Sequence, residues 1–429
     1  MDFFLFTSVG TGYIASMNKA CIISIGNELL SGQTVDTNAS WLAARLLEKG
    51  VLTAGIWLVP DEKQRIVRAI EDASQQGELI VVTGGLGPTD DDLTRDAVAA
   101  YLGVELKFHA QILETIEAFF QKRGKKMAPK NRSQAYLPAG AERLDNPIGT
   151  APGFRARKKD IDIVVMPGVP AEMKQMFTAH VLPPLEQSLP SARVVCRKLR
   201  CFGAGESEIA QKLGNLMERG RNPLINCTCG SGDIVLHINA VSGDEATACS
   251  MISEDTAAIK KCLGELVYGQ DDQSLAEVVG NLLKKNHKTI AAAESCTGGL
   301  LSQMLTEMPG SSQYMLAGWV TYSNEAKIRL LGVPEKLIAD SGAVSGPVAQ
   351  SMAIQAARKS GADIAVAITG IAGPGGRTDE KPVGLVYISV FMDGDCIVQE
   401  HRFPAINRHW VRLRSALTAL NCIRLRLQV

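Results

Sequence analysis

A five-residue apolar run, Thr289 to Ala293, ends in Glu-Ser-Cys-Thr-Gly-Gly and passes directly into a helix-like segment, Leu300–Met308. A short apolar strand, a glycine turn and a helix form the repeating unit of a parallel α/β sheet, so this segment restricts the fold strongly. The turn carries a hydroxyl at Ser295 and a thiol at Cys296. A helix N-terminus aims its backbone amides at the same place. The sequence therefore predicts a strand, a sharp turn and a helix, with a possible nucleophile at the turn.

Residues 17–190 show the same alternation of apolar runs and amphipathic helices. The predicted strands are Cys21–Ile25, Ala54–Val59, Leu79–Val82 and Ile161–Met166, and the predicted helices are Ser40–Lys49, Asp61–Gln75, Thr94–Tyr101, Ala110–Arg123 and Ala171–Leu182. This rhythm predicts a parallel sheet covered by helices on both faces. Pro183-Pro184 is expected to end the last helix.

A second alternation fills residues 270–429. Its predicted strands are Thr289–Ala293, Trp319–Thr321, Asp363–Ile368 and Gly384–Phe391, and its predicted helices include Ser274–Asn286, Ser345–Lys359 and Asn407–Leu427. Residues 193–268 contain two strand-like and two helical segments without a site-like cluster. We therefore expect an α/β protein: two three-layer α/β domains, at 17–190 and 270–429, joined by a small α+β domain at 193–268.

Composition excludes some classes of protein. Lys plus Arg and Asp plus Glu both number 45, so the net charge is near zero, which argues against nucleic-acid binding by bulk electrostatics. The ten cysteines form no Cys-x-x-Cys pair and predict reduced thiols in a cytoplasmic protein. The sequence has no 18-residue apolar run, so we expect no membrane span. Residues 1–16 lack the basic start of a signal peptide and are expected to be a disordered extension or a misassigned start before Met17.

The predicted C-terminal domain offers a serine or a cysteine as nucleophile. No histidine lies near Ser295 or Cys296 in the sequence, which weakens a histidine-based mechanism. Lys327 is the alternative base, provided that burial lowers its pKa, and Ser323 is expected to cap the helix that carries it. Tyr322 could relay or stabilise the transferring proton. Thr369 and Gly370 end an apolar strand, where open α/β sheets place binding sites.

The predicted N-terminal domain has four polar or glycine-rich segments, three of them directly after strands: Gly26–Asn38, Thr83–Thr94, Asn146–Phe154 and Met166–Met173. We expect them to meet at one edge of the sheet. Glycines there let backbone amides approach a phosphate, and the acids can hold a divalent metal. Taken alone, the run Asp90–Asp92 is better explained as a helix N-terminus, which favours acidic residues.

Residues 274–429 resemble the C-terminal domain of the CinA (competence/damage-inducible protein) family, which also occurs alone as nicotinamide mononucleotide deamidase, PncC. The strings that carry the resemblance include Ala-Ala-Glu-Ser-Cys-Thr-Gly-Gly-Leu, Pro-Gly-Ser-Ser, Val-Thr-Tyr-Ser-Asn-Glu-Ala-Lys and Ile-Thr-Gly-Ile-Ala-Gly-Pro-Gly-Gly. The resemblance implies hydrolysis of nicotinamide mononucleotide to nicotinic acid mononucleotide and ammonia. It implies Ser295 as nucleophile, Lys327 as general base and Tyr322 as assisting hydroxyl, with no metal or other cofactor. The substrate-binding residues that it implies are Gly298, Gly299, Ser312, Thr369, Gly370, and Arg408 or Arg412 at the nucleotide phosphate.

Residues 19–185 resemble the N-terminal domain of the same family, which is similar to the molybdopterin-binding MoaB/MogA fold. This resemblance implies metal-dependent hydrolysis of the pyrophosphate of ADP-ribose, with Mg, Mn or Co as the metal. The substrate-binding residues that it implies are Glu28, Asp36, Asn38, Gly84, Gly85, Thr89, Thr94 and Glu172, and the metal ligands are Asp91 and Asp92. By position, residues 193–268 match the family's KH-like connector. This connector lacks a Gly-x-x-Gly loop, so no RNA binding is inferred.

Three functions follow from these resemblances. The first is a bifunctional enzyme of pyridine-nucleotide recycling, which acts on nicotinamide mononucleotide and on ADP-ribose. The alternatives are a molybdopterin-binding protein and a non-catalytic partner in DNA uptake. A homodimer is expected from the resemblance, and Cys296 remains an alternative nucleophile to Ser295.

Overall fold

The computed structural model describes residues 19–188, 193–230 and 232–428. Residues 1–16, expected to be an extension or a misassigned start, lie outside the described residues. The chain divides into two compact units, the first mostly made of residues up to Cys196 and the second mostly of residues from Arg197. The expected α/β class is confirmed, because two mixed sheets are each covered by helices and a third, smaller sheet lies between them in sequence.

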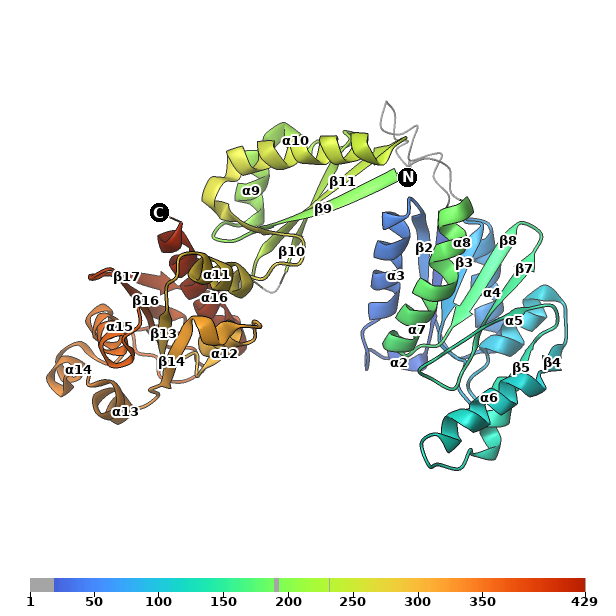
Figure 1. Cartoon of the computed structure of the whole chain (residues 1–429), viewed down its shortest axis with the longest axis horizontal. Coiled ribbons are helices and arrows are strands. Elements are labelled where there is room, and N and C mark those ends of the chain that lie inside the picture. The colour runs from blue at the N-terminus through green and yellow to red at the C-terminus, as the bar shows by residue number, and fades with distance from the viewer. Residues whose placement is uncertain (1–18, 189–192, 231, 429) are drawn as a thin grey trace. The chain divides into compact units, whose positions relative to one another are not determined.

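The N-terminal sheet has six strands in the order β2-β1-β3-β8-β7-β6. Figure 1 shows β2, β3, β8 and β7 of this sheet. Strands β1, β2, β3 and β8 are parallel, whereas β7 and β6 are antiparallel, so the expectation of a purely parallel sheet is wrong at this edge. A tight turn joins β7 to β8, and such a turn can connect only antiparallel strands. The strands are β1 (Lys19–Ile25), β2 (Leu52–Val59), β3 (Leu79–Thr83), β6 (Glu142–Leu144), β7 (Gly153–Lys158) and β8 (Ile161–Met166), and a separate pair is formed by β4 (Leu106–Phe108) and β5 (Tyr136–Pro138).

Helices cover both faces of this sheet, as the alternating sequence predicts. One apolar core lies beneath α4, α5 and α6, and the other beneath α3 and α7. The central strands β1, β3 and β8 are nearly continuous runs of buried residues because both of their faces are covered. The helices are α2 (Asn27–Leu30), α3 (Thr37–Glu48), α4 (Lys63–Ser74), α5 (Thr94–Leu102), α6 (Ala110–Gln121), α7 (Pro170–Met176) and α8 (Leu182–Ser188), with a 3₁₀ segment η1 (Pro129–Ala135).

The prediction that Pro183-Pro184 ends the last helix of this domain is wrong. A π-helical turn, η2 (Phe177–Val181), follows α7, and α8 then begins at Leu182. Both prolines therefore lie inside a continuous helical run, directly after its π-helical turn.

The small middle sheet has the strand order β10-β11-β9-β12. Its strands are β9 (Arg193–Cys201), β10 (Leu224–Cys229), β11 (Ile234–Ser242) and β12 (Val267–Gln270), and its helical segments are α9 (Glu206–Leu213), η3 (Gly214–Met217), α10 (Glu245–Leu263) and η4 (Gly264–Leu266). The sequence identified β9, β11 and both long helices but not β10 or β12.

The C-terminal sheet has five strands in the order β14-β13-β15-β16-β17. Strands β14, β13 and β15 are parallel, and β16 and β17 are antiparallel additions. The strands are β13 (Ile290–Glu294), β14 (Met315–Val320), β15 (Ile364–Gly370), β16 (Leu385–Met392) and β17 (Asp395–Arg402), and the helical segments are α11 (Leu275–Lys285), α12 (Leu300–Thr306), η5 (Ser311–Gln313), α13 (Asn324–Ala326), η6 (Lys327–Leu331), α14 (Glu335–Ser341), α15 (Gly346–Ser360) and α16 (Arg408–Leu427).

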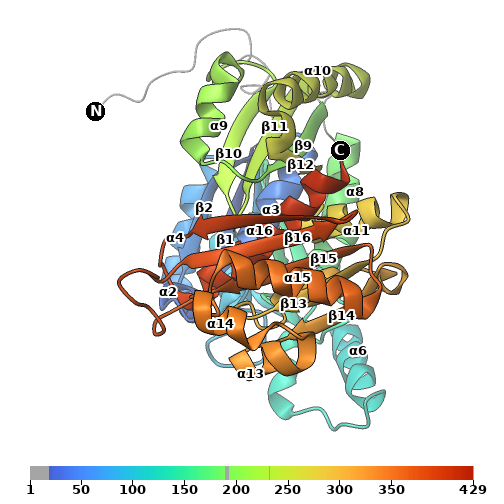
Figure 2. The same cartoon turned by 90° about the vertical axis from the view of Figure 1, so that its left-hand side faces the viewer.

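This sheet also has two covered faces, so the domain has three layers. Helices α11, α12 and α16 enclose the larger core, and α14 and α15 enclose the other. Figure 2 looks onto the face covered by α14 and α15. Among the described residues, no helix is long and apolar enough to cross a membrane.

Candidate active sites

Ser295 follows the last residue of β13 and begins a tight turn. Its backbone N–H donates to the carbonyl of Ile368 at 2.9 Å, which extends the pairing of β13 with β15 by one residue. Its carbonyl accepts from the N–H of Gly298 at 3.1 Å, which closes the turn. Gly298 and Gly299 have φ angles of 60° and 94°, a left-handed conformation that favours glycine. The two glycines therefore let the chain reverse between the strand and α12 while Ser295 stays at the strand end.

The side chain of Glu294 holds this turn in place by hydrogen bonds. Its fully buried carboxylate accepts from the backbone N–H groups of Gly299, Leu301 and Ser302 at 2.8–3.0 Å and from the Ser302 hydroxyl at 2.6 Å. These amides belong to the first turn of α12, which lacks partners within the helix. Sequence reasoning assigned no role to Glu294, although an acidic residue before a glycine turn and a helix is typical of such a contact.

Lys327 lies against Ser295 and is 1% exposed. Ser323 caps the helix that leads to it, accepting from the N–H of Ala326 at 3.0 Å as the sequence predicts. The Lys327 Nζ lies 3.0 Å from Ser295 Oγ, 2.9 Å from the carbonyl of Thr321 and 3.5 Å from that of Tyr322. Burial lowers the pKa of Lys327, although the nearby Cys296 opposes this effect. Within the described residues, no carboxylate forms an ion pair with it.

The three neighbours of Nζ suit both forms of the amine: the charged form can donate to all three, and the neutral form can use its lone pair toward Ser295 Oγ. A neutral lysine has two N–H donors and one lone pair, whereas a charged one has three donors and no acceptor. The carbonyls of Thr321 and Tyr322 can accept from two N–H groups. In the neutral form, the lone pair then faces the Ser295 hydroxyl, which can donate its proton to Nζ. This is the geometry of a serine nucleophile with a lysine base.

The Cys296 side chain is packed in the apolar core of the domain. Its side chain is 5% exposed and belongs to the apolar core beneath α11, α12 and α16. Burial raises the pKa of its thiol to about 12. Because the thiolate is the nucleophilic form of cysteine, the thiol of Cys296 is unreactive near neutral pH.

Tyr322 contacts Arg408, whereas Arg412 contacts the nucleophile turn. The Tyr322 side chain is 60% exposed, and its hydroxyl accepts from Arg408 at 2.7 Å; Ser295 and Lys327 are not its hydrogen-bond partners. Arg408 is exposed and also donates to the carbonyl of Gly373. Arg412 donates twice to the carbonyl of Thr297, at 2.6 and 3.1 Å, and so supports the nucleophile turn. Arg408 and Arg412 therefore have different hydrogen-bond partners, a difference that the sequence could not show.

Thr369, Gly370 and Ser312 complete the set predicted for this domain. Thr369 and Gly370 end β15 beside the Ser295 turn, but the buried Thr369 hydroxyl donates to the carbonyl of Ala343 at 2.8 Å. Ser312 lies in η5, before the first residue of β14. Because β14 runs parallel to β13, Ser312 lies at the opposite end of the sheet from Ser295. The structure does not bring Ser312 to the Ser295–Lys327 pair.

The N-terminal candidate site is a cavity of about 430 Å³ at the carboxyl ends of the parallel strands. The segments after β1, β3 and β8 and the loop at Thr150 line it together, as expected for an open α/β sheet. Five acidic side chains line the cavity and, among the described residues, no lysine or arginine does. The acidic residues are Glu28, Asp61, Asp91, Asp92 and Glu172.

Several predicted residues of this site hold its loops in place. Asp92 accepts from the N–H groups of Gly87 and Thr89 at 2.7 and 2.8 Å and from the Thr89 hydroxyl at 2.5 Å. The buried Thr94 hydroxyl donates to the carbonyl of Gly84 at 2.9 Å. A side chain at Gly84 would overlap the carbonyl of Ile25, and one at Gly85 would overlap the Thr94 hydroxyl. The close approach of these segments therefore requires glycine at both positions.

Asp36 and Asn38 lie outside the lining of the cavity. Asp36 caps α3 by accepting from the N–H of Ala39 at 2.9 Å. Asn38 is 8% exposed and donates to the carbonyl of Gly168 at 2.7 Å, which ties α3 to the segment after β8. The sequence placed both residues near strand ends correctly, but their side chains support the loops.

Asp61 is a cavity residue that sequence reasoning missed. It accepts from the N–H of Asn27 at 2.9 Å. Its pKa is raised, first by burial and then by the negative charges of Glu28, Asp91 and Asp92, although the bond from Asn27 opposes this. In the sequence, Asp61 precedes a helix and is indistinguishable from an ordinary acidic residue at a helix start.

The cavity residues fit a divalent cation of the magnesium type. Among the described residues, no three His, Cys, Asp or Glu side chains form a ready-made metal cluster. Magnesium commonly binds one or two carboxylates and completes its shell with water and substrate phosphates, so it needs no such cluster. Burial, and after it repulsion from the neighbouring acids, raises the pKa of Asp61, and a bound cation would relieve the repulsion. One or two of the carboxylates of Glu28, Asp61 and Asp91 would hold it, because Asp92 already accepts three hydrogen bonds from its own loop.

Family comparisons cover almost the whole chain. A model described as "Probable molybdopterin binding domain" matches residues 21–187, one described as "Damage-inducible protein CinA KH domain" matches 196–269, and one described as "CinA C-terminal domain" matches 272–427. A "CinA-like protein" of Kosmotoga olearia is 40% identical over 406 residues, which cover 95% of this chain and 98% of that protein. The chain belongs to the CinA family. The resemblance read from the sequence is thereby confirmed.

Two further similar proteins have related names. A "Putative competence-damage inducible protein" of Clostridioides difficile is 39% identical over 417 residues, or 96% of this chain and 99% of that protein. Among solved structures, a "competence/damage inducible protein CihA from Agrobacterium tumefaciens" is 42% identical and covers 36% of this chain and 94% of its own, with a TM-score of 0.35. The names of these CinA relatives state no reaction.

In the nucleophile turn of this CinA chain, the N–H groups of Cys296 and Thr297 face the Cys296 sulfur, where they partly oppose the rise that burial gives to the pKa of its thiol. The N–H groups of Gly298 and Gly299 are engaged by Ser295 and Glu294. Among the described residues, no backbone carbonyl or carboxylate accepts from the N–H groups of Cys296 and Thr297. These two amides lie directly after the nucleophile, where an oxyanion hole in acyl transfer is built.

Proposed function

We propose that this CinA protein is a nicotinamide mononucleotide amidohydrolase that uses Ser295 as nucleophile and Lys327 as base. The observation that supports it is the 3.0 Å distance between Lys327 Nζ and Ser295 Oγ in a buried setting. Burial lowers the pKa of Lys327, so at a given pH more of the amine is neutral than in an exposed lysine.

The reaction follows from this geometry. The Ser295 hydroxyl gives its proton to Lys327 as Oγ bonds to the carboxamide carbon, and the carboxamide oxygen becomes an oxyanion. Backbone N–H groups of the turn that begins at Ser295 stabilise that charge. The Lys327 ammonium then protonates the leaving nitrogen, ammonia departs, and an acyl-enzyme ester remains. Water attacks the ester, gives a proton to Lys327, and nicotinic acid mononucleotide leaves as Ser295 regains its proton.

The exposed Arg408 suits the phosphate of the nucleotide. Its guanidinium already bridges the Tyr322 hydroxyl and the carbonyl of Gly373, so it is held in place without an ion pair. A planar guanidinium matches the oxygens of a phosphate group. Tyr322 then acts by orienting Arg408, which differs from the proton-relay role expected from the sequence.

Ammonia release from nicotinamide mononucleotide tests this function. Ser295→Ala should lower it at least about a thousandfold, because the covalent route is lost. Ser312→Ala is the matched control and should keep wild-type activity, since Ser312 lies at the other end of the sheet. Unchanged ammonia release from the Ser295→Ala protein would contradict the proposal.

A second activity is favoured by the acid-lined cavity: hydrolysis of ADP-ribose to AMP and ribose phosphate. When bound, a divalent metal would neutralise the pyrophosphate oxygens there. One or two of Glu28, Asp61 and Asp91 would hold the ion, and the glycine segment at Gly84 and Gly85 lets the backbone approach the phosphates. AMP release should require Mg, Mn or Co and stop with EDTA. Tight pterin binding without AMP release under any metal would instead favour a molybdopterin-binding protein.

A further inference from the structure

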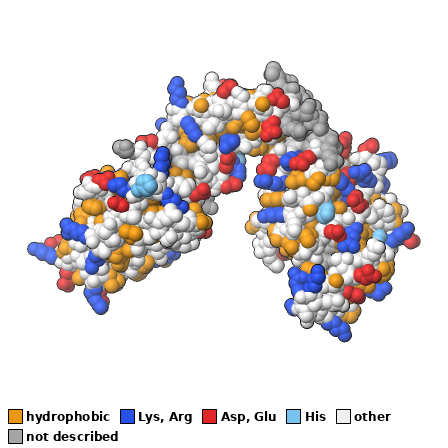
Figure 3. All heavy atoms as spheres, viewed as in Figure 1, with side chains coloured by type: hydrophobic (Ala, Val, Ile, Leu, Met, Phe, Trp, Pro, Cys, Tyr) orange, Lys and Arg blue, Asp and Glu red, His pale blue; other side chains and the backbone are white. Residues whose placement is uncertain are grey.

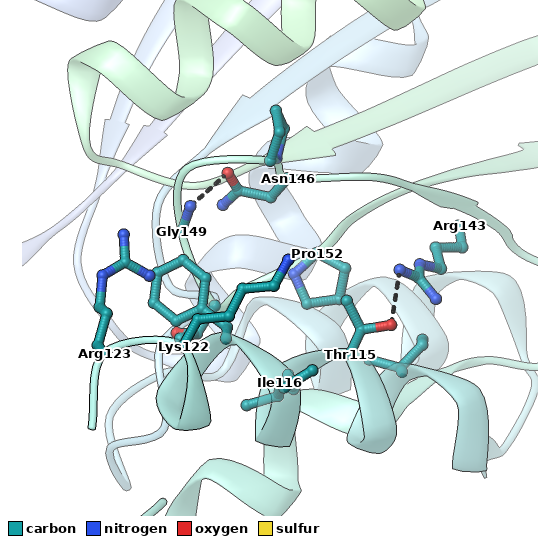
Figure 4. Close-up of a pocket in the computed structure, with 13 residues that line it drawn as sticks. Thr115, Ile116, Lys122, Arg123, Arg143, Asn146, Gly149 and Pro152 are labelled. Carbon is teal, nitrogen blue, oxygen red and sulfur yellow. Dashed lines mark hydrogen bonds between the residues drawn. The ribbon is translucent and has the colours of Figure 1, made fainter. Parts of the chain in front are cut away.

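A second cavity of the N-terminal domain, of about 440 Å³, lies between α6 and the loop that follows β6. Lys122, Arg123 and Arg143 line it, and none of the described residues that line it is acidic. Figure 4 shows Lys122 and Arg123 on one side of the cavity and Arg143 on the other. In Figure 3, Lys and Arg side chains gather over this end of the domain. The cavity is thus opposite in charge to the one at Gly84.

Among the described residues, two of its three cationic groups form no ion pair. Arg143 forms an ion pair with Asp145 at 2.7 Å. Lys122 and Arg123 are exposed and form no ion pair with any residue that the structure describes. The Arg123 guanidinium lies 3.5 Å from the centre of the Phe119 ring, and stacking on a ring face leaves the N–H groups at the guanidinium edge available. The C-terminus of α6 favours cations at these positions, but it does not account for Arg143 on the opposite wall.

One loop forms a wall of both cavities. Asn146 donates to Glu172 at 2.7 Å on the acidic side and accepts from the N–H of Gly149 at 2.9 Å. Thr150 lines the acidic cavity and the basic one. Without a cation, the acidic cavity repels anionic groups. The basic cavity, on the other side of this loop, attracts them.

We propose that the basic pocket binds the phosphate of a small phosphomonoester, such as a mononucleotide or a sugar phosphate. Lys122 and Arg123 supply an ammonium and a guanidinium fork for the phosphate oxygens. The side chains of Ile112, Ile116 and Phe119 offer an apolar wall for the organic part. The volume lies within the range of small-molecule sites. This site is separate from both proposed activities and does not depend on either.

Isothermal titration of the full chain with 5′-AMP tests the proposal, with EDTA present so that no cation recruits phosphate to the acidic cavity. The Lys122→Ser/Arg123→Ser protein should bind at least about tenfold more weakly than wild type, because two charge-assisted contacts are lost. The matched control, Lys125→Ser/Lys126→Ser, removes the same charge from neighbouring exposed residues that do not line the pocket and should bind as wild type does. Circular dichroism verifies that both proteins fold.

Three outcomes would overturn the proposal. The first is no saturable binding of 5′-AMP by the wild type. The second is equal binding of adenosine, which lacks the phosphate. The third is an equal loss of affinity for 5′-AMP in both double variants. In that case, a single-stranded oligonucleotide that binds more tightly than 5′-AMP and loses affinity in both variants would show that the basic side chains bind a polyanion at the surface. Selective loss in the Lys122→Ser/Arg123→Ser protein alone supports the pocket.

Discussion

The Ser295–Lys327 pair and the acidic cavity at Gly84 differ in how completely the chain alone assembles them. Ser295 and Lys327 are both buried and in contact, and the turn that begins at Ser295 is held by Glu294 and Arg412. The acidic cavity has five carboxylates but, among the described residues, no ready-made metal cluster. Two of its predicted functional acids, Asp36 and Asp92, are engaged in capping and loop contacts.

This difference reflects what each proposed reaction requires. Acyl transfer by a serine needs a base, a nucleophile and backbone amides, all of which a folded chain provides. Pyrophosphate hydrolysis needs the charge of a cation, and the protein provides only an unbalanced set of acids. Variants of the first site should therefore act on catalysis, and variants of the second should act on the affinity for the cation.

The largest effect is expected from Lys327. Lys327→Met removes the base while keeping an apolar chain of similar length, and ammonia release should fall about 10²–10⁴-fold. In the wild type, kcat/KM should rise with pH as Lys327 loses its proton, with a midpoint below the 10.5 of an unburied lysine. Lys327→Arg should also be inactive at every pH, since arginine stays protonated. Wild-type activity in the Lys327→Met protein would remove Lys327 from the mechanism.

Stability gives an independent measurement on the same residue. Because the pKa of Lys327 is lower in the folded state, the unfolded chain binds more protons between that pKa and 10.5. The free energy of unfolding of the wild type should therefore rise with pH in this window relative to that of Lys327→Met. Urea unfolding at several pH values measures the difference, and parallel curves would show that burial does not shift the pKa.

A smaller effect is expected at Asp61 in the acidic cavity. Asp61→Asn keeps an oxygen for the N–H of Asn27 but removes one charge, so the concentration of metal needed for AMP release should rise about 10–100-fold. Asp90→Asn is the matched control, because Asp90 is 91% exposed and pairs with Lys130. Equal shifts in both variants would show that the effect comes from net charge alone.

With rising pH, ionisation of Asp61 should change the stability of the protein in the opposite direction to deprotonation of Lys327. Burial and three neighbouring acids raise its folded pKa above 3.8, so ionisation destabilises the metal-free protein as the pH rises. Without metal, Asp61→Asn should therefore be at least as stable as the wild type near neutral pH. A loss of stability would show that Asp61 serves the fold more than the cavity.

Patterns along the chain were sufficient for residues whose local sequence determines their place. Ser295 follows an apolar strand and precedes two glycines, and Ser323 stands at a helix start, so both positions could be predicted. The central strands could also be predicted, because burial on both faces gives continuous apolar runs. The antiparallel strands β6, β7 and β17 were not recognised, because β6 has only three residues and β7 and β17 are rich in charged and polar side chains instead of forming an apolar run.

Residues whose role depends on a distant partner could not be predicted. Arg408 and Arg412 are one helical turn apart, and only the packing of α16 against the Thr297 turn separates them. Ser312 and Ser295 are close in sequence, yet the direction of β14 takes Ser312 to the far end of the sheet. Asp61 joins the cavity only because β2 lies next to β1 in the sheet.

The smallest effect is expected from Cys296, the neighbour of the nucleophile. Cys296→Ala should keep ammonia release within about threefold of wild type and cost about 1 kcal/mol of stability, since it removes one buried sulfur from the core. Iodoacetamide at pH 7 should label the exposed Cys249 and Cys262 and spare Cys296, because burial raises its pKa to about 12. Mass spectrometry of the labelled peptides distinguishes them. Loss of activity that follows labelling of Cys296, and that Cys296→Ala reproduces, would transfer the nucleophile from the hydroxyl to the thiol. It would also mean that the turn opens in solution, because only an exposed and ionised sulfur reacts.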